Sequence, residues 1–375
     1  MKIAVPREVH PDEQRIALVP DEIRKLVKAE HEVVVETGAG AGSSYTDEMY
    51  RQAGANIAAS SDELYKDAEV IFKVRPPQKA EIGKLPQGCL LISFLEVLRE
   101  PGIAKDLAEQ NVTAVGLEMV PRISRAQSMD ALSSQASAAG YKAVLIAAEA
   151  IRKYFPMLTT AAGTVRPARV FVLGAGVAGL QAIATARRLG ATVEAFDIRS
   201  ATKGEVESLG AKFIEIDLGE SGEGEGGYAK EISEEAKKRE HEVLKEVMSK
   251  CDVVVTTAAV PGKKAPVLVT EDMVAAMKPG SVIVDMAVEQ GGNVVGSRPG
   301  QRVDVNGVTI IGPINLPSQM AIHTSQLFAR NIVTLFNHLV QDGQLTLDFA
   351  DEITAGAVIT HAGEVVNKKA KELLA

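Results

Sequence analysis

The sequence predicts an α/β protein with two Rossmann-like, doubly wound parallel-sheet domains and an inter-domain cleft. Three observations support this fold class. Short apolar, β-branched runs alternate with helical patterns, which is typical of parallel sheets covered by helices. A glycine-rich turn joins one such run to an Ala-rich helical pattern. The 375 residues, of which 46% are hydrophobic, are enough for about two domains.

The first half of the chain shows this alternation most plainly. A helix is expected at 20–29, and helical segments separate the later strands. The expected strands are 2–6, 31–36, 56–58, 69–74, 89–94 and 112–116. No phosphate-binding glycine motif occurs here, so this half is similar to a Rossmann-like domain without a nucleotide.

A polar stretch at 118–137 precedes a helical run from about 130 to 154. We expect the chain to cross between domains here. The predicted domains are therefore 1–128 plus 318–375, and 129–317. Two interpretations of the stretch stay open. A polar loop between domains is a usual place for functional residues. Composition alone favours a solvated linker in which Ser128 or Asp130 only caps the helix.

The glycine-rich turn follows the strand-like run at 168–173 and has the spacing Gly-x-Gly-x-x-Gly. Gly174 permits the tight turn, Gly176 leaves room for a pyrophosphate, and Gly179 allows close helix–strand packing. The free N–H groups of Val177 and Ala178 at the helix start then face the phosphates. The bland alternative is a glycine turn in a βαβ unit that binds no cofactor.

A second strand at 192–196 ends in Asp197, at about the ~20-residue offset of the acid that binds the adenosine ribose. A carboxylate there favours a free 2′-hydroxyl and repels a 2′-phosphate. We therefore expect NAD(H) rather than NADP(H), although the nearby Arg199 weakens this preference slightly.

The loop at 217–228 is rich in glycine and acidic residues, so we expect it to be mobile. Tyr228 at its end is predicted to fold over the cofactor; the alternative is a flexible insertion with a surface tyrosine. A charged helix at 230–250 follows. Further expected elements are strands at 252–256, 281–285 and 308–311, an amphipathic helix at 324–340, and a helical final segment that returns to the first domain.

Composition excludes several functions. The net charge of −8 gives no reason to expect nucleic acid, and no apolar run approaches the ~20 residues of a membrane helix. Cys89 and Cys251 lie in apolar runs and are predicted to be buried thiols in a reducing compartment. No Cys/His cluster suggests a metal site, and no signal peptide is recognised, so a cytoplasmic protein is expected.

Several stretches together resemble the alanine dehydrogenase/nicotinamide nucleotide transhydrogenase superfamily. They are 13–17, 73–76, 121–130, 140–141, 160–165, the glycine motif and 284–292. Within it, Pro-Arg-Ile-Ser-Arg-Ala-Gln-Ser-Met-Asp at 121–130, Leu-Ser-Ser-Gln at 132–135 and Gly-Gly-Tyr-Ala-Lys at 226–230 are similar to the NAD(H)-binding components of proton-translocating transhydrogenases. The chain ends where a fused relative would enter the membrane, so it resembles a separate α1-type subunit.

This resemblance implies an NAD(P)⁺ transhydrogenase of the Si-specific/Re-specific type, active only with its NADP(H)-binding partner. Hydride would pass directly between NAD(H) on this chain and NADP(H) on that β subunit. Membrane-spanning subunits would couple the transfer to proton translocation. The resemblance also implies a homodimer, held peripherally on the cytoplasmic face of the inner membrane by its partners, with no direct membrane insertion.

The resemblance also implies roles for individual residues. Arg122 and Asp130 would orient the dihydronicotinamide, joined by Ser133, and Gln127 would donate a hydrogen bond toward the facing NADP(H). Catalysis would then rest on proximity, with the two rings ~3–3.5 Å apart. The implied cofactor-binding set is Gly174, Gly176, Val177, Ala178, Gly179, Asp197, Ile198, Arg199, Gly227, Tyr228 and Ala259.

The alanine dehydrogenase branch is the main alternative. It needs an arginine, a lysine, a histidine and an aspartate, because it must bind a carboxylate and move protons. Arg15 and Lys73 match the first two, but Glu96 and Glu289 stand where the histidine and aspartate would align. Arg15 and Lys73 are either an inherited carboxylate site or ordinary cations in ion pairs. A non-catalytic NAD-binding protein is the third hypothesis.

Overall fold

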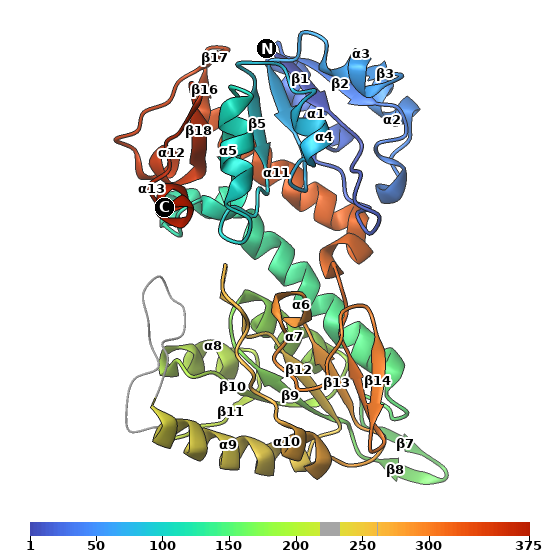
Figure 1. Ribbon diagram of the computed structural model, residues 1–375. Coiled ribbons are helices and arrows are strands. Elements are labelled where there is room, and N and C mark those ends of the chain that lie inside the picture. The colour runs from blue at the N-terminus through green and yellow to red at the C-terminus, as the bar shows by residue number, and fades with distance from the viewer. Residues whose placement is uncertain (218–232, 261) are drawn as a thin grey trace. The chain divides into compact units, whose positions relative to one another are not determined.

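A computed structural model describes residues 1–217, 233–260 and 262–375 of the chain (Figure 1). The chain divides into two compact units. Unit 1 contains Met1–Gln135 and Pro317–Ala375, and unit 2 contains Ala136–Leu316. Each unit is built on its own mostly parallel sheet with helices, which confirms the predicted α/β class.

Unit 1 holds an eight-stranded sheet in the order β19-β18-β6-β5-β4-β1-β2-β3. Its parallel strands are β1 (Lys2–Val5), β2 (Glu32–Glu36), β3 (Asn56–Ala58), β4 (Val70–Phe72), β5 (Leu90–Ser93) and β6 (Thr113–Gly116). From β3 to β6 this is the doubly wound order 3-2-1-4-5-6. The antiparallel strands β18 (Val358–His361) and β19 (Glu364–Val365) extend the β6 edge.

The helices of unit 1 cover both faces of this sheet. They are α1 (Pro20–Lys28), α2 (Asp47–Gln52), α3 (Ser61–Tyr65), α4 (Lys79–Ile82), α5 (Gly102–Glu109), α11 (Ala321–Leu339), α12 (Glu352–Ala357) and α13 (Lys368–Leu374). Alternate residues of β1 enter two different cores: Ile3 packs in the core that includes α11, and Ala4 packs in the core that includes α5. Burial on both faces explains why these strands are apolar throughout.

Unit 2 repeats the same winding in a seven-stranded sheet of order β11-β10-β9-β12-β13-β15-β14. Its strands are β9 (Arg169–Leu173), β10 (Thr192–Phe196), β11 (Lys212–Phe213), β12 (Val253–Thr256), β13 (Val282–Asp285), β15 (Val308–Ile311) and the antiparallel β14 (Arg302–Val305). Its helices are α7 (Val177–Arg188), α8 (Lys203–Ser208), α9 (Glu234–Ser249) and α10 (Glu271–Ala276). The helix α6 (Ala131–Ala150) begins in unit 1 and ends in unit 2.

The helical expectation for the final segment is wrong in part. After α11 the chain forms a hairpin of β16 (Val340–Gln341) and β17 (Gln344–Leu345), and later the hairpin of β18 and β19. Both turns contain two residues with positive φ: Asp342 (49°) with Gly343 (72°), and Ala362 (49°) with Gly363 (79°). Such turns match the twist of a β-hairpin, and Asp-Gly is a strong sequence signal for one.

A further hairpin, β7 (Leu158–Thr160) with β8 (Gly163–Val165), was also not expected. It carries exposed side chains rather than a buried face, so its hydrophobic pattern is weak. Cys89 and Cys251 are buried free thiols as predicted, and burial raises the pKa of each to about 12. Among the described residues, no helix combines the length and the apolar character that crossing a membrane requires.

Candidate functional site

The glycine turn of unit 2 lies between β9 and α7, and each of its glycines is needed for a different reason. Gly174 has a φ of 98°, a conformation that other residues rarely adopt. A Cβ on Gly179 would lie 1.8 Å from the carbonyl oxygen of Gly174, so only glycine permits this helix–strand approach. A Cβ on Gly176 would meet nothing within 4 Å, so that position faces open space. This combination fits a dinucleotide pyrophosphate.

The loop after β12 closes the other side of the glycine turn. Strands β9 and β12 are neighbours at the point where the strand order reverses, which is where ligands bind in open α/β sheets. The hydroxyl of Thr257 donates to the carbonyl oxygen of Gly174 at 3.0 Å. Ala259, a predicted cofactor-binding residue, lies two residues further along this loop and is half-buried.

Two buried polar residues that the sequence reasoning missed hold this loop in place. Asn293 is fully buried, and its amide accepts from the N–H of Ala258 at 3.1 Å and donates to the carbonyl of Ala258 at 2.8 Å. Asp285 at the end of β13 is also fully buried and accepts from the N–H of Asn293 at 3.1 Å. A signal for Asp285 was available, since it ends a parallel strand at the same sheet edge as Gly174.

Asp197 lies beside the glycine turn, as its spacing predicts. Its carboxylate is 8% exposed and accepts from the N–H of Ala175 at 2.7 Å. Arg199 forms a bidentate pair with it, with Nε and Nη2 each 2.8 Å from a carboxylate oxygen. Ile198 is half-buried between them in sequence. The structure therefore brings the predicted ribose acid and the pyrophosphate turn together.

The first turn of α7 is also the contact point of α6. A Cβ on Gly140 would lie 2.0 Å from the carbonyl oxygen of Ala178, so glycine is required for the two helices to approach. Val177 is exposed and Ala178 is half-buried. Among the described residues, no side chain caps this helix start, which leaves its N–H groups available to an anion.

Gly227 and Tyr228 lie outside the described residues, so the predicted closure of Tyr228 over the cofactor has no structural counterpart here.

The predicted catalytic residues all lie in unit 1. A 3₁₀ helix at Ser124–Met129 presents Gln127 to solvent, and Arg122 just before it is also exposed. The buried side chains of Ala126 and Met129 belong to the same core as α11 and anchor the segment. Polar side chains on an anchored, exposed segment are suited to contact a ligand or a partner.

Asp130 caps α6. Its carboxylate accepts from the backbone N–H of Ser133 at 2.8 Å and from the hydroxyl of Ser133 at 2.6 Å. The cap that the sequence allowed at Ser128 or Asp130 is thus made by Asp130, and Ser133 is its partner. Instead, the carbonyl oxygen of Ser128 accepts from the amide of Asn331 at 2.8 Å.

Arg15 and Lys73 both lie buried in ion pairs. Arg15 is 4% exposed, with Nε and Nη2 at 2.8 and 2.7 Å from the two oxygens of Glu13. Lys73 is fully buried, with Nζ 2.9 Å from Glu81 and 3.5 Å from Glu8. Burial alone lowers the pKa of Lys73, but Glu8 and Glu81 outweigh it and raise that pKa. These contacts favour the ion-pair interpretation over a carboxylate-binding site.

Glu96, at the position of the family histidine, has an unusual backbone. Its φ is 53°, and the buried carboxylate of Glu118 accepts from the N–H groups on either side, those of Leu95 at 3.0 Å and Val97 at 3.1 Å. The side chain of Glu96 pairs with Arg75 at 3.3 Å. Glu289 accepts from the N–H of Asn315 at 2.9 Å. Both carboxylates are therefore engaged in contacts within their own units.

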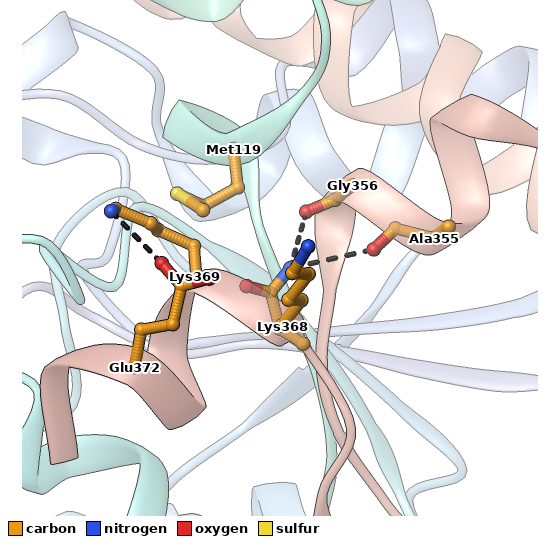
Figure 2. A pocket seen from close by; sticks show the side chains of 7 residues that line it. Met119, Ala355, Gly356, Lys368, Lys369 and Glu372 are labelled. Carbon is orange, nitrogen blue, oxygen red and sulfur yellow. Dashed lines mark hydrogen bonds and ion pairs between the residues drawn. The ribbon is translucent and has the colours of Figure 1, made fainter. Parts of the chain in front are cut away.

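A cavity of about 340 Å³ lies elsewhere in unit 1, between α12 and α13 (Figure 2). Lys369 on its wall pairs with Glu372 at 3.1 Å, and the amide of Asn367 donates to Gly356 at 2.8 Å. The residues that line it include none of the predicted site residues.

Comparison with known proteins gives concordant matches over the whole chain. Residues 4–139 match the alanine dehydrogenase/PNT N-terminal domain, and residues 143–368 match the alanine dehydrogenase/PNT C-terminal domain. The first portion of the divided NAD(P) transhydrogenase subunit alpha of Rhodospirillum rubrum is 48% identical over 98% of both chains. The crystal structure of the transhydrogenase from Sinorhizobium meliloti is 41% identical, covers 98% of this chain and 99% of its own, and has a TM-score of 0.86. An L-alanine dehydrogenase structure is more distant in sequence, at 28% identity, with a TM-score of 0.84 over 100% of this chain and 99% of its own.

Proposed function

Since the chain belongs to the alanine dehydrogenase/PNT family, we propose that it is the NAD(H)-binding subunit of a proton-translocating transhydrogenase. Direct hydride transfer joins NAD(H) on this chain to NADP(H) on a partner subunit, and the membrane subunits couple that step to proton movement. Its likeness to the transhydrogenase α subunits, at 48% identity over nearly the full length, supports this assignment.

The observation that carries the proposal is the shape of the glycine turn beside Asp197. Gly176 leaves space where a pyrophosphate needs to approach the backbone, and the N–H groups of Val177 and Ala178 begin α7 next to it. Asp197 supplies a buried carboxylate for the adenosine ribose, with Ile198 beside it. The remaining wall comes from Ala259, with Gly227 and Tyr228 as the closing segment. Bound NAD(H) supplies the hydride donor or acceptor.

In unit 1, we assign the nicotinamide end of the cofactor to the segment from Arg122 to Ser133. Arg122 and Asp130 orient the ring and its amide, and Ser133 supports Asp130 through the two hydrogen bonds of the helix cap. Gln127 is exposed, so its amide is available to a hydrogen-bond acceptor on the partner's NADP(H). None of these groups needs to give or take a proton, because a hydride moves between two carbons.

The alanine dehydrogenase alternative lacks support at the positions that matter. Oxidative deamination needs a group that moves protons near neutral pH, and histidine is suited to this. Glu96 stands there instead and is paired with Arg75. Arg15 and Lys73, the cations that would bind a substrate carboxylate, already have buried carboxylate partners. A non-catalytic NAD-binding protein, in turn, has no use for an exposed polar segment at the nicotinamide end.

We further propose that the chain is a homodimer that works with an NADP(H)-binding β subunit and membrane-spanning subunits, on the cytoplasmic face of the inner membrane. The β7–β8 hairpin gives a second copy a surface to cover. Tyr154, Met157 and Val165 are 58%, 63% and 44% exposed, and Val165 pairs with Leu158 next to Met157. Exposed apolar side chains gathered in this way are typical of association surfaces.

Hydride transfer from NADPH to an NAD⁺ analogue with shifted absorbance tests the function. We expect transfer only when this chain is mixed with an NADP(H)-binding transhydrogenase subunit. The same preparation given NADH, pyruvate and ammonia is expected to stay inactive. Consumption of NADH with pyruvate and ammonia, without transfer in the mixture, would replace the transhydrogenase assignment with the amino-acid dehydrogenase one.

A further inference from the structure

The carboxylate of Asp197 has no hydrogen-bonding capacity left over. An ionised carboxylate offers about four acceptor positions. Oδ1 accepts from the backbone N–H of Arg199 at 2.9 Å and from its Nε at 2.8 Å. Oδ2 accepts from the N–H of Ala175 at 2.7 Å and from Nη2 of Arg199 at 2.8 Å. A ribose with two hydroxyl donors must therefore replace two of these four bonds.

The four donors differ in how easily they can leave. The N–H groups of Ala175 and Arg199 belong to the backbone of the glycine turn and of the segment after β10, so they are fixed by the fold. The guanidinium of Arg199 sits on a flexible side chain that is 20% exposed, whereas the carboxylate is 6% exposed. The two guanidinium bonds are thus the pair that two ribose hydroxyls can replace one for one.

We propose that Arg199 is a specificity-determining residue: its guanidinium occupies the ribose positions on Asp197 and is displaced when the dinucleotide binds. This inference rests on the proposed NAD(H) function. Only the fraction of molecules in which the pair is open accepts the ribose, so the pair lowers the apparent affinity for NAD(H).

Displacement also changes the discrimination between the two dinucleotides. The released guanidinium remains beside the ribose, where a planar fork of donors matches a 2′-phosphate well. Asp197 repels that phosphate, but Arg199 attracts it. Arg199 therefore narrows the preference for NAD(H) that Asp197 alone would set.

The test measures dissociation constants for NADH and NADPH by calorimetry. Arg199→Met removes the competitor and the phosphate partner together, so NADH is expected to bind about fivefold more tightly or better. NADPH is expected to bind more weakly. Together these changes raise the ratio of the NADPH to the NADH constant by about tenfold or more. Lys203→Met is the matched control, because Lys203 pairs with Glu215 instead and its substitution removes the same charge nearby; the ratio for this control is expected to equal that of the wild type.

Arg199→Lys keeps the charge but not the fork, and guards against a loss of folding in the methionine variant, since removing one partner of a buried pair destabilises a protein. Tighter NADH binding with NADPH binding retained is expected for it. Equal weakening of both dinucleotides in both variants, with unchanged circular dichroism, would show that Arg199 only orients Asp197 and would overturn the inference. Failure of the wild type to bind NADH at all would instead refute the proposed function.

Discussion

The side-chain amide of Asn293 pairs with the backbone of Ala258 as one β-strand pairs with another. It accepts from the N–H of Ala258 at 3.1 Å and donates to its carbonyl oxygen at 2.8 Å. The same amide also donates to the carbonyl of Pro266 at 2.8 Å. A residue 35 positions away in sequence thus fixes the loop that faces the glycine turn.

Asn293→Asp tests this contact. The substitution keeps the acceptor but turns the donor into a second oxygen, which then faces the carbonyls of Ala258 and Pro266 in a buried site. We expect a loss of about 2–3 kcal/mol in the free energy of unfolding, measured in urea, and weaker NADH binding. Asn337→Asp is the control, because Asn337 is exposed on α11. Equal stability of the two variants would contradict the role assigned to Asn293.

Gly176→Ala and Gly179→Ala separate folding from cofactor binding. The alanine methyl at 176 meets open space, so the melting temperature should stay near that of the wild type, while NADH binding is lost because the methyl blocks the pyrophosphate. At 179 the methyl would lie 1.8 Å from the carbonyl oxygen of Gly174, so the melting temperature should fall by several degrees. Thermal unfolding and NADH titration of both variants check this. NADH affinity unchanged in Gly176→Ala would remove the glycine turn from the binding site.

Gln127→Asn shortens an exposed side chain by one methylene. We expect hydride transfer to the partner's NADP(H) to slow by about tenfold or more, because transfer depends steeply on positioning. NADH affinity and unfolding free energy should change by less than about 0.5 kcal/mol. The transfer rate is measured in the mixture with the partner subunit. An unaltered rate would exclude Gln127 from the transfer site.

Asp130 has a structural contact and a proposed ligand contact, and two substitutions distinguish them. Asp130→Asn keeps an oxygen for the cap, so its stability should stay close to that of the wild type. Asp130→Ala loses the cap and about 1 kcal/mol of unfolding free energy. If Asp130 also orients the nicotinamide, both variants transfer hydride slowly. Normal transfer in the asparagine variant would leave the helix cap as the whole role of Asp130.

Asp351 gives the stability of unit 1 an acid limit. Burial alone would raise the pKa of Asp351, but hydrogen bonds from Arg125, Thr354 and His338 lower it to about 2 from an ordinary value of 3.8. A folded pKa below the unfolded one stabilises the protein above about pH 4, and this stabilisation is lost as the pH falls toward 2. Asp351→Asn should therefore be less stable than the wild type at pH 5, with the difference narrowing toward pH 2. Urea unfolding at several pH values measures it. A constant difference across that range would contradict the assignment.

The winding of both sheets and the transhydrogenase resemblance were predictable, because parallel strands leave apolar runs and the glycine motif has a fixed spacing. Both are confirmed. The hairpin strands of the last segment were missed, although Asp342-Gly343 was a visible signal for one of them. Strands of two residues are too short to show a hydrophobic period.

The partners of Arg15 and Lys73 show where sequence reasoning ends. Spacing alone did not decide between a ligand site and an ion pair, because the third contact of Arg15 is with Gln135, 120 residues away. The same holds for Asn293 and Ala258. Long-range polar contacts of this kind depend on how the loops at a sheet edge meet, and no local pattern encodes them.

The pairing of β18 with β6 sets an order on the synthesis of the protein. Strand β6 ends at residue 116, and β18 begins at residue 358, beyond all of unit 2. During translation every residue of unit 2 therefore leaves the ribosome before the first sheet gains its last partners. Domains fold as units during synthesis, so the nucleotide-type domain is able to fold while the first domain still has an open edge at β6. An exposed edge is a template for wrong pairing, which makes this nascent stage the one where chaperones matter most for the chain.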